Sequence, residues 1–221
     1  DATADLVGLF HWGSNASLLT EPPTERPDGE TQHYSVSPDQ LGLFSAIDYL
    51  AFEFWTQEVI RIPAGTALEV DLLPHTARLY RLVPTTDVPA FLASDRHLLM
   101  GPGIVSQFPF NSETGVLSGS VETVEGTAQT LWFVVPEGWG LKAVTVDGQA
   151  QPVSEQDPNG TLRLSLENLT TGEHSLQLQF DGVQQEFFLS GAGAADVDCG
   201  PDAAVDQSAV EVQFAVAGAL E

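Results

Sequence analysis

The sequence predicts an all-β protein: an antiparallel β-sandwich, or two packed blocks of this kind. Two observations predict this fold class. From about residue 67 onward, apolar and polar residues alternate with a period of two, and Asn-Gly or Asp-Gly pairs separate alternating runs. Alternation places one side of each strand on a core and the other in water, as antiparallel sandwich strands require. With 221 residues, 43% of them hydrophobic, the chain can form one large β-domain or two small ones.

The expected strands follow from the spacing of their apolar residues. Four runs place apolar residues two positions apart, which predicts strands with one buried face: 68–72, 162–166, 176–180 and 210–216. The run 131–135 carries apolar residues on both faces. The segments 6–12 and 50–55 are also apolar on both faces, as expected of central strands. Because Trp12, Trp55 and Trp132 lie in these strongly apolar segments, all three are expected in the core.

Turn signals agree with this fold. Asn-Gly and Asp-Gly tolerate the positive φ of tight turns, which are expected at Asp147-Gly148, Asn159-Gly160 and Asp181-Gly182. The last of these turns is expected to join 176–180 and 183–189 as a hairpin. The sequence Ser37-Pro38-Asp39-Gln40 has the spacing of a helix capping box, and Gly42 limits that helix to a single turn.

Composition along the chain suggests four parts. We expect a first β-block at 1–96, a second β-rich block at 97–189, an acidic flexible linker at 190–207 and a C-terminal strand at 208–221. That last strand must pair with something. It either folds back on its own sheet or pairs with an open sheet edge of a neighbouring subunit, so self-assembly is one expectation.

The charge is strongly acidic. Seven Lys and Arg residues against 31 Asp and Glu residues give a net charge of −24, which excludes nucleic acid and anionic membranes as partners because both need a basic surface. Together with three sequons, at Asn15, Asn159 and Asn168, the acidic coat favours an extracellular or cell-surface glycoprotein. The lone Cys199 allows no intramolecular disulfide. Because the chain begins with Asp1, we expect it to be processed, trimmed or a piece of a longer polypeptide.

Motifs of known chemistry are absent. The sequence has no nucleophile elbow, HExxH motif or phosphate-binding loop, so no catalytic residue and no resident cofactor is predicted. The five histidines are scattered. His174 is in phase with Leu176 and Leu178, and is expected to be partly buried and hydrogen-bonded, whereas His75 is expected in a structural turn.

Two sites of binding are considered. Asp196, Asp198, Asp202 and Asp206 cluster in the linker and either hold calcium or form a solvated acidic segment. Trp139 lies in the turn-like sequence Pro136-Glu137-Gly138-Trp139-Gly140 and either contacts a sugar or packs over a sheet edge.

Four sequence blocks resemble, in order, the C-terminal β-domain of α-galactosidase and raffinose-synthase-like glycoside hydrolases, the melibiase group. They are 7–12 (VGLFHW), 41–43 with 49–55 (LGL and YLAFEFW), 73–79 (LPHTARL) and 89–98 (PAFLASDRHL). The first departs from the family at His11, where Asn is usual. Looser similarity continues through 114–119, 134–136 and 144–148, whereas residues after about 189 match nothing in the family.

The resemblance implies a β-sandwich accessory domain without catalytic residues, because the family's catalytic carboxylates lie on a preceding (β/α)₈ barrel. Its shared residues would serve packing and loop fixation, and the barrel would be the partner. The expected function is therefore structural support of that barrel, and the chain by itself is not expected to be an enzyme. A free-standing carbohydrate-binding module and a surface or assembly protein using 208–221 are the alternatives.

Overall fold

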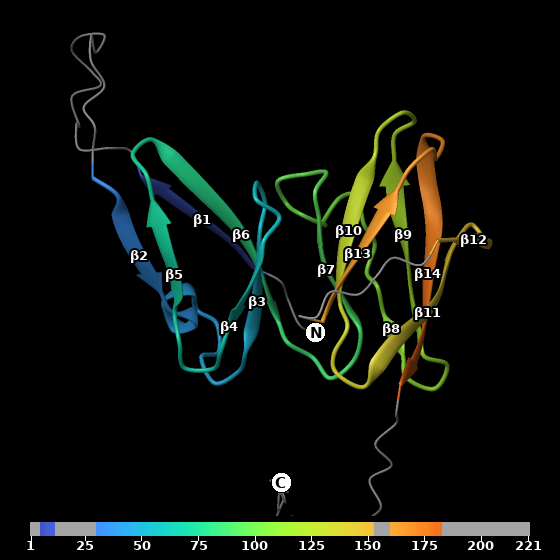
Figure 1. The fold of residues 1–221 in the computed structure, drawn as a ribbon, viewed down its shortest axis with the longest axis horizontal. Helices are drawn as coiled ribbons and strands as arrows, with labels where there is room; N and C mark the ends of the chain where they lie inside the picture. The colour runs from blue at the N-terminus through green and yellow to red at the C-terminus, as the bar shows by residue number, and fades with distance from the viewer. Residues whose placement is uncertain (1–4, 12–29, 153–159, 183–221) are drawn as a thin grey trace, which may run out of the picture. The chain divides into compact units, whose positions relative to one another are not determined.

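The computed structural model describes residues 5–11, 30–152 and 160–182. Within these ranges the chain folds into fourteen β-strands and one 3₁₀ turn, and every paired strand is antiparallel (Figure 1). The predicted all-β class is therefore confirmed. In this part of the chain, no helix has the length and apolar character needed to cross a membrane.

The N-terminal strands form a first sandwich of two sheets. A four-stranded sheet has the order β1-β6-β3-β4, and a two-stranded sheet pairs β2 with β5. Their bounds are β1 Asp5–His11, β2 Gln32–Val36, β3 Tyr49–Glu53, β4 Val59–Ile62, β5 Leu68–Leu72 and β6 Thr76–Pro84. Inward residues of both sheets meet in one buried core, which includes Val7, Tyr49, Leu68, Val70, Leu72 and Leu82.

The later strands form a second sandwich, also of two sheets. A three-stranded sheet has the order β13-β10-β7, and a five-stranded sheet has the order β12-β11-β14-β9-β8. Their bounds are β7 Ala90–Ser94, β8 Phe110–Asn111, β9 Val116–Thr123, β10 Gln129–Val134, β11 Trp139–Val146, β12 Gln149–Gln151, β13 Thr161–Leu166 and β14 Gly172–Gly182. The core between the two sheets contains Leu131, Phe133, Leu164, Leu176 and Leu178, all of them buried.

A third apolar cluster joins the two sandwiches. Phe52 of β3 packs against Trp132 of β10, with ring centroids 4.7 Å apart, and Val83 of β6 and Leu92 of β7 belong to the same cluster. The described residues of both sandwiches accordingly belong to one compact unit. Strand β7, which falls in the first predicted block, pairs with β10 of the second sandwich. The predicted block boundary at residue 96 itself stays a prediction.

Most of the expected local structure is confirmed. Buried and exposed residues alternate along β5 and β14, while every residue of β10 is buried. The single helical turn spans Pro38–Leu41, and the Ser37 amide donates to Gln40 Oε1 at 2.9 Å. Asp147 and Gly148 have φ values of 50° and 76° in the tight turn between β11 and β12, as the Asp-Gly signal predicts.

Two burial predictions are wrong. Strand β1 is the last strand of its sheet in the described part of the chain, not a central one, and the side chains of Leu6 and Phe10 are exposed. Trp55 is 53% exposed because it lies in the turn after β3, where its ring meets the ring of Phe54 edge-on. Trp132 is 4% exposed, as predicted, and Trp12 lies outside the described residues.

The predicted turn at Asp181-Gly182 is also wrong. Strand β14 continues through both residues, which pair with Gly140 and Trp139 of β11. Gly182 serves packing instead: a Cβ atom at this position would overlap the indole ring of Trp139. Asp181 forms an ion pair with Lys142 at 3.2 Å. The expected partner strand at 183–189 lies outside the described residues.

Candidate functional site

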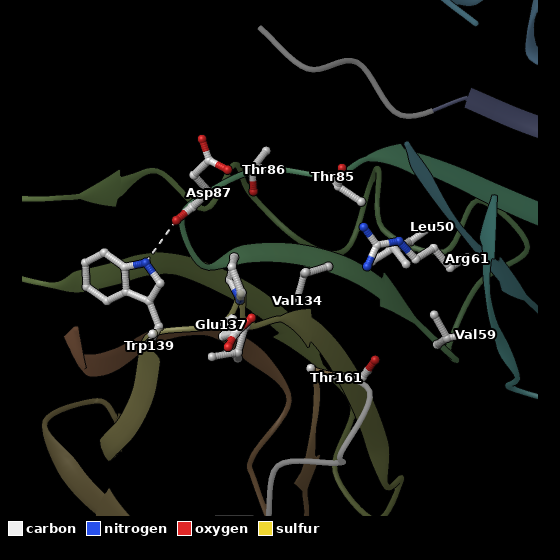
Figure 2. Close-up of a pocket in the computed structure, with 14 residues that line it drawn as sticks. Leu50, Val59, Arg61, Thr85, Thr86, Asp87, Val134, Glu137, Trp139 and Thr161 are labelled. Carbon is white, nitrogen blue, oxygen red and sulfur yellow. Dashed lines mark hydrogen bonds between the residues drawn. The ribbon is translucent and has the colours of Figure 1, made fainter. Parts of the chain in front are cut away.

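A cleft of about 980 Å³ opens where both sandwiches contribute residues (Figure 2). Leu50 of β3, with Val59 and Arg61 of β4, lines it from the first sandwich. The segment 85–87, which connects β6 to β7, the turn between β10 and β11, and Thr161 of β13 supply its other polar residues. Its volume is that of a site for a small ligand, which typically measures about 300–1,000 Å³.

Trp139 stands at one end of this cleft. Its Nε1 atom donates a hydrogen bond to the backbone oxygen of Asp87 at 2.9 Å, drawn as the dashed line in Figure 2. The indole ring is half-buried, lies against Gly182 and meets the ring of Phe110 at 84° with centroids 4.9 Å apart. The ring therefore packs over the sheet, and sugar contact at Trp139 stays a prediction.

Two residues that line the cleft have carboxylates without a hydrogen bond or ion pair among the described residues. Asp87 and Glu137 line it, both residues are exposed, and neither carboxylate has a hydrogen bond or an ion pair with any residue that the structure describes. The hydrogen bond to Trp139 uses only the backbone of Asp87. Both carboxylates are thus free to accept hydrogen bonds from a ligand.

The opposite end of the cleft carries a guanidinium. Arg61 donates to Asp48 Oδ2 through Nε at 3.0 Å and Nη2 at 2.5 Å. The hydrogen bond from Arg61 lowers the pKa of Asp48, and the Ala64 amide adds to this effect. Because the pair is charge-balanced, this end offers N–H donors without a net positive charge.

A general acid–base role for the cleft has no support in its geometry. Glycoside hydrolysis by a carboxylate pair needs one acid held in an environment that keeps it protonated. Asp87 and Glu137 are both exposed, and no described side chain orients either carboxylate.

The other predicted site residues lie away from the cleft. Asn168 is exposed after β13, where a sugar could be attached to it. His75 occupies the turn between β5 and β6 with φ of 59°, as expected of a structural turn. The remaining predicted residues lie outside the described ranges: Asn15, Asn159, Asp196, Asp198, Asp202 and Asp206. Among the residues that are described, no three His, Cys, Asp or Glu side chains form a group that could hold a metal ion.

Sequence reasoning missed a buried carboxylate at Glu53. This side chain is 2% exposed, accepts hydrogen bonds from the Thr56 amide and hydroxyl at 2.5 and 2.7 Å, and lies 3.5 Å from Arg78. The sequence did contain a signal for this burial. Glu53 follows Tyr49 and Ala51 at two-residue spacing, which places all three on the inward face of β3.

His174 forms a buried polar contact in the second sandwich, as predicted. Its Nδ1 lies 2.6 Å from Asp147 Oδ2 and its Nε2 lies 2.9 Å from the Thr170 backbone oxygen. Both ring nitrogens face acceptors, so the doubly protonated imidazolium satisfies both contacts. The hydrogen bond to Asp147 raises the pKa of His174 above 6.5, and the contact with Thr170 raises it further.

Stability is expected to fall as pH rises through the elevated pKa of His174. A group whose pKa is higher in the folded state stabilises the fold fully below its unfolded pKa, near 6.5, and loses this contribution above its folded pKa. Urea unfolding between pH 6 and 9 should show this decline, and His174→Gln should reduce it.

The matched comparison is His33→Gln. The hydrogen bond to Asp71 also raises the pKa of His33, but this side chain is exposed, so solvent screens its ion pairs. His33→Gln should therefore reduce the decline less than His174→Gln does. Stability that rises between pH 6 and 9 would contradict the prediction.

Comparison with known families finds no family model that matches the chain, and comparison with curated proteins finds no significant match. The chain is therefore described by its own structure: an all-β protein of two joined sandwiches, with a polar cleft to which both contribute.

Proposed function

We propose that the chain is a non-catalytic accessory module of an α-galactosidase-like glycoside hydrolase and structurally supports a catalytic (β/α)₈ barrel. The described residues of the four blocks that carry this resemblance fall on β1, on the end of the 3₁₀ turn and β3, on the β5–β6 turn with the start of β6, and on β7 with the residues that follow it. Strands and turns are where residues shared for packing and loop fixation are expected.

The observation that carries the proposal is the contact between Glu53 and Arg78. These residues come from the second and third blocks, 25 positions apart, and their side chains meet at 3.5 Å. Glu53 is buried and held by Thr56 as well. Two charged residues of the resemblance are therefore used to fix neighbouring strands, as a structural module requires.

Exposed apolar side chains also support an accessory role. Leu6 of β1 lies opposite Arg81 of β6, and Arg81 Nη1 donates to the Met100 backbone oxygen at 3.2 Å. Leu98 and Leu99, in the same loop as Met100, are exposed, as is Leu6. Exposed large apolar side chains are candidates for packing on another domain where they adjoin on the surface.

The native polypeptide provides the test. We expect denaturing electrophoresis of the protein from its source to show a mass far above 23.6 kDa, and peptide mapping to find (β/α)₈-barrel peptides in the same polypeptide. The chain produced alone should hydrolyse no aryl-galactoside. A native product of 23.6 kDa, or turnover that a single carboxylate substitution abolishes, would overturn the proposal.

A free-standing carbohydrate-binding module is the second candidate, and the cleft at Trp139 favours it. The third candidate, assembly through 208–221, rests on residues outside the described ranges and stays a prediction. Calcium binding by the linker carboxylates also lies outside the described ranges and stays a prediction.

A further inference from the structure

We infer that the cleft binds a neutral sugar, and that it does so by hydrogen bonds to Asp87 and Glu137 rather than by stacking on Trp139. The inference extends the second candidate function, the carbohydrate-binding module, and takes from it only that the ligand is a sugar. It is independent of the accessory role, since a module attached to a barrel would keep the same cleft.

The lining of the cleft combines an apolar surface with polar groups at its ends. Figure 2 shows Val134 between the side chains of Glu137 and Arg61, with Leu50 and Val59 on the side of Arg61. A sugar ring presents C–H groups on its faces and hydroxyl groups around its edge. An apolar surface with polar groups on either side matches that distribution.

The hydrogen-bonding groups match hydroxyl groups, which both donate and accept. The carboxylates of Asp87 and Glu137 accept, and the Arg61 guanidinium donates. The Thr86 hydroxyl already donates to the Val88 backbone oxygen at 2.7 Å, and the Thr85 hydroxyl donates to the Asp48 backbone oxygen at 3.3 Å. Both hydroxyl oxygens therefore keep acceptor capacity.

Charge selects against an anionic ligand. The protein carries a net charge of −24, and the Arg61 guanidinium is balanced by Asp48. Two uncommitted carboxylates would repel a phosphate, sulfate or acidic sugar brought into the cleft. The charge-balanced Arg61–Asp48 pair offers hydrogen-bond donors to a neutral polyol without repelling a cation, so an organic amine is the competing ligand class that the test below includes.

Trp139 positions the backbone of Asp87 and does not stack on the sugar ring. Its ring rests on Gly182 and packs nearly perpendicular to the ring of Phe110, and its Nε1 holds the backbone of Asp87. This last bond joins the segment between β6 and β7 to the start of β11. It therefore fixes the backbone from which the Asp87 carboxylate extends.

The test is a binding measurement on the chain with a panel of neutral mono- and oligosaccharides, first on an array and then by NMR titration of the ligand that is retained. Alanine at both Asp87 and Glu137 should weaken binding by about ten-fold or more, because hydrogen bonds to charged groups are lost. Glu125→Ala is the matched control: this exposed carboxylate lies in the turn before β10, whereas Glu137 lies in the turn after β10. We expect the control to bind as the parent does.

Three outcomes would overturn the inference. They are the absence of binding to every neutral sugar at millimolar concentration, an equal loss in the Glu125→Ala control, and tighter binding of an organic amine or a phosphate than of any neutral sugar. The native-mass experiment tests the accessory role, and the sugar-binding experiment tests the cleft. Either proposal can therefore fail while the other stands.

Discussion

Replacing Trp132 by alanine is expected to lower the free energy of unfolding by about 3–5 kcal/mol, the usual cost of removing a large buried aromatic side chain. Trp132 is 4% exposed, packs on Phe52 of the other sandwich and lies under the guanidinium of Arg163, 5.7 Å from its ring. The truncation would leave a cavity in the cluster that joins the sandwiches. Urea titration followed by circular dichroism measures the loss.

The control for this substitution is Trp55→Ala. Trp55 is 53% exposed, so the same truncation should remove little buried surface and cost about 0.5 kcal/mol or less. Comparable losses in the two variants would contradict the assignment of Trp132, and not Trp55, to the core.

Gly115→Ala is expected to destabilise the protein by about 2–4 kcal/mol, the sum of a left-handed backbone penalty and a steric overlap. Gly115 has φ of 68° in the turn between β8 and β9, and an added Cβ would lie 2.5 Å from the backbone oxygen of Phe180. The neighbouring backbone cannot retreat easily, because the Phe180 amide donates to the Gly115 oxygen at 2.8 Å. Thermal or urea unfolding would measure the change.

Gly126→Ala separates the two contributions. Gly126 has φ of 76° in the turn between β9 and β10, and an added Cβ would meet nothing within 4 Å. This variant should show only the backbone penalty, about 1–2 kcal/mol. If both alanine variants lose the same stability, the overlap at Phe180 contributes nothing and the prediction fails.

Local patterns predicted much of the fold because local physics decides it. The two-residue alternation of β5, β13 and β14 needs only one buried face, and the Asp147-Gly148 turn needs only two residues that tolerate positive φ. The capping box before Pro38 is likewise contained in four residues. Each of these features can be recognised without knowing which strands become neighbours.

Features that depend on strand neighbours were missed. An apolar run on both faces indicates burial, but it does not say whether the strand is central: β3 lies between β6 and β4, whereas β1 ends its sheet among the described strands. The pair Asp181-Gly182 has the composition of a turn, yet the indole of Trp139 on the adjacent strand explains the glycine. Such reasons become visible only when the pairing is known.

The same limit applies to the cleft. Trp139 was singled out from its turn-like sequence, and the structure places it on the cleft wall. The sequence did not single out the carboxylate of Asp87, because Asp87 and Glu137 are 50 positions apart and no motif connects them. Their proximity to one cleft follows from the packing of two sandwiches, which periodicity does not encode.

The cluster around Phe52 and Trp132 has a thermodynamic consequence for the cleft. Leu50 and Val59 pack on the same cluster that buries Val134, and these three residues also line the cleft. The cleft therefore exists only while the two sandwiches remain packed together. Ligand binding and inter-sandwich packing are therefore linked equilibria. A ligand held in the cleft would raise the melting temperature of both sandwiches together. A substitution that loosens the cluster between the sandwiches would weaken ligand binding by the same coupling free energy.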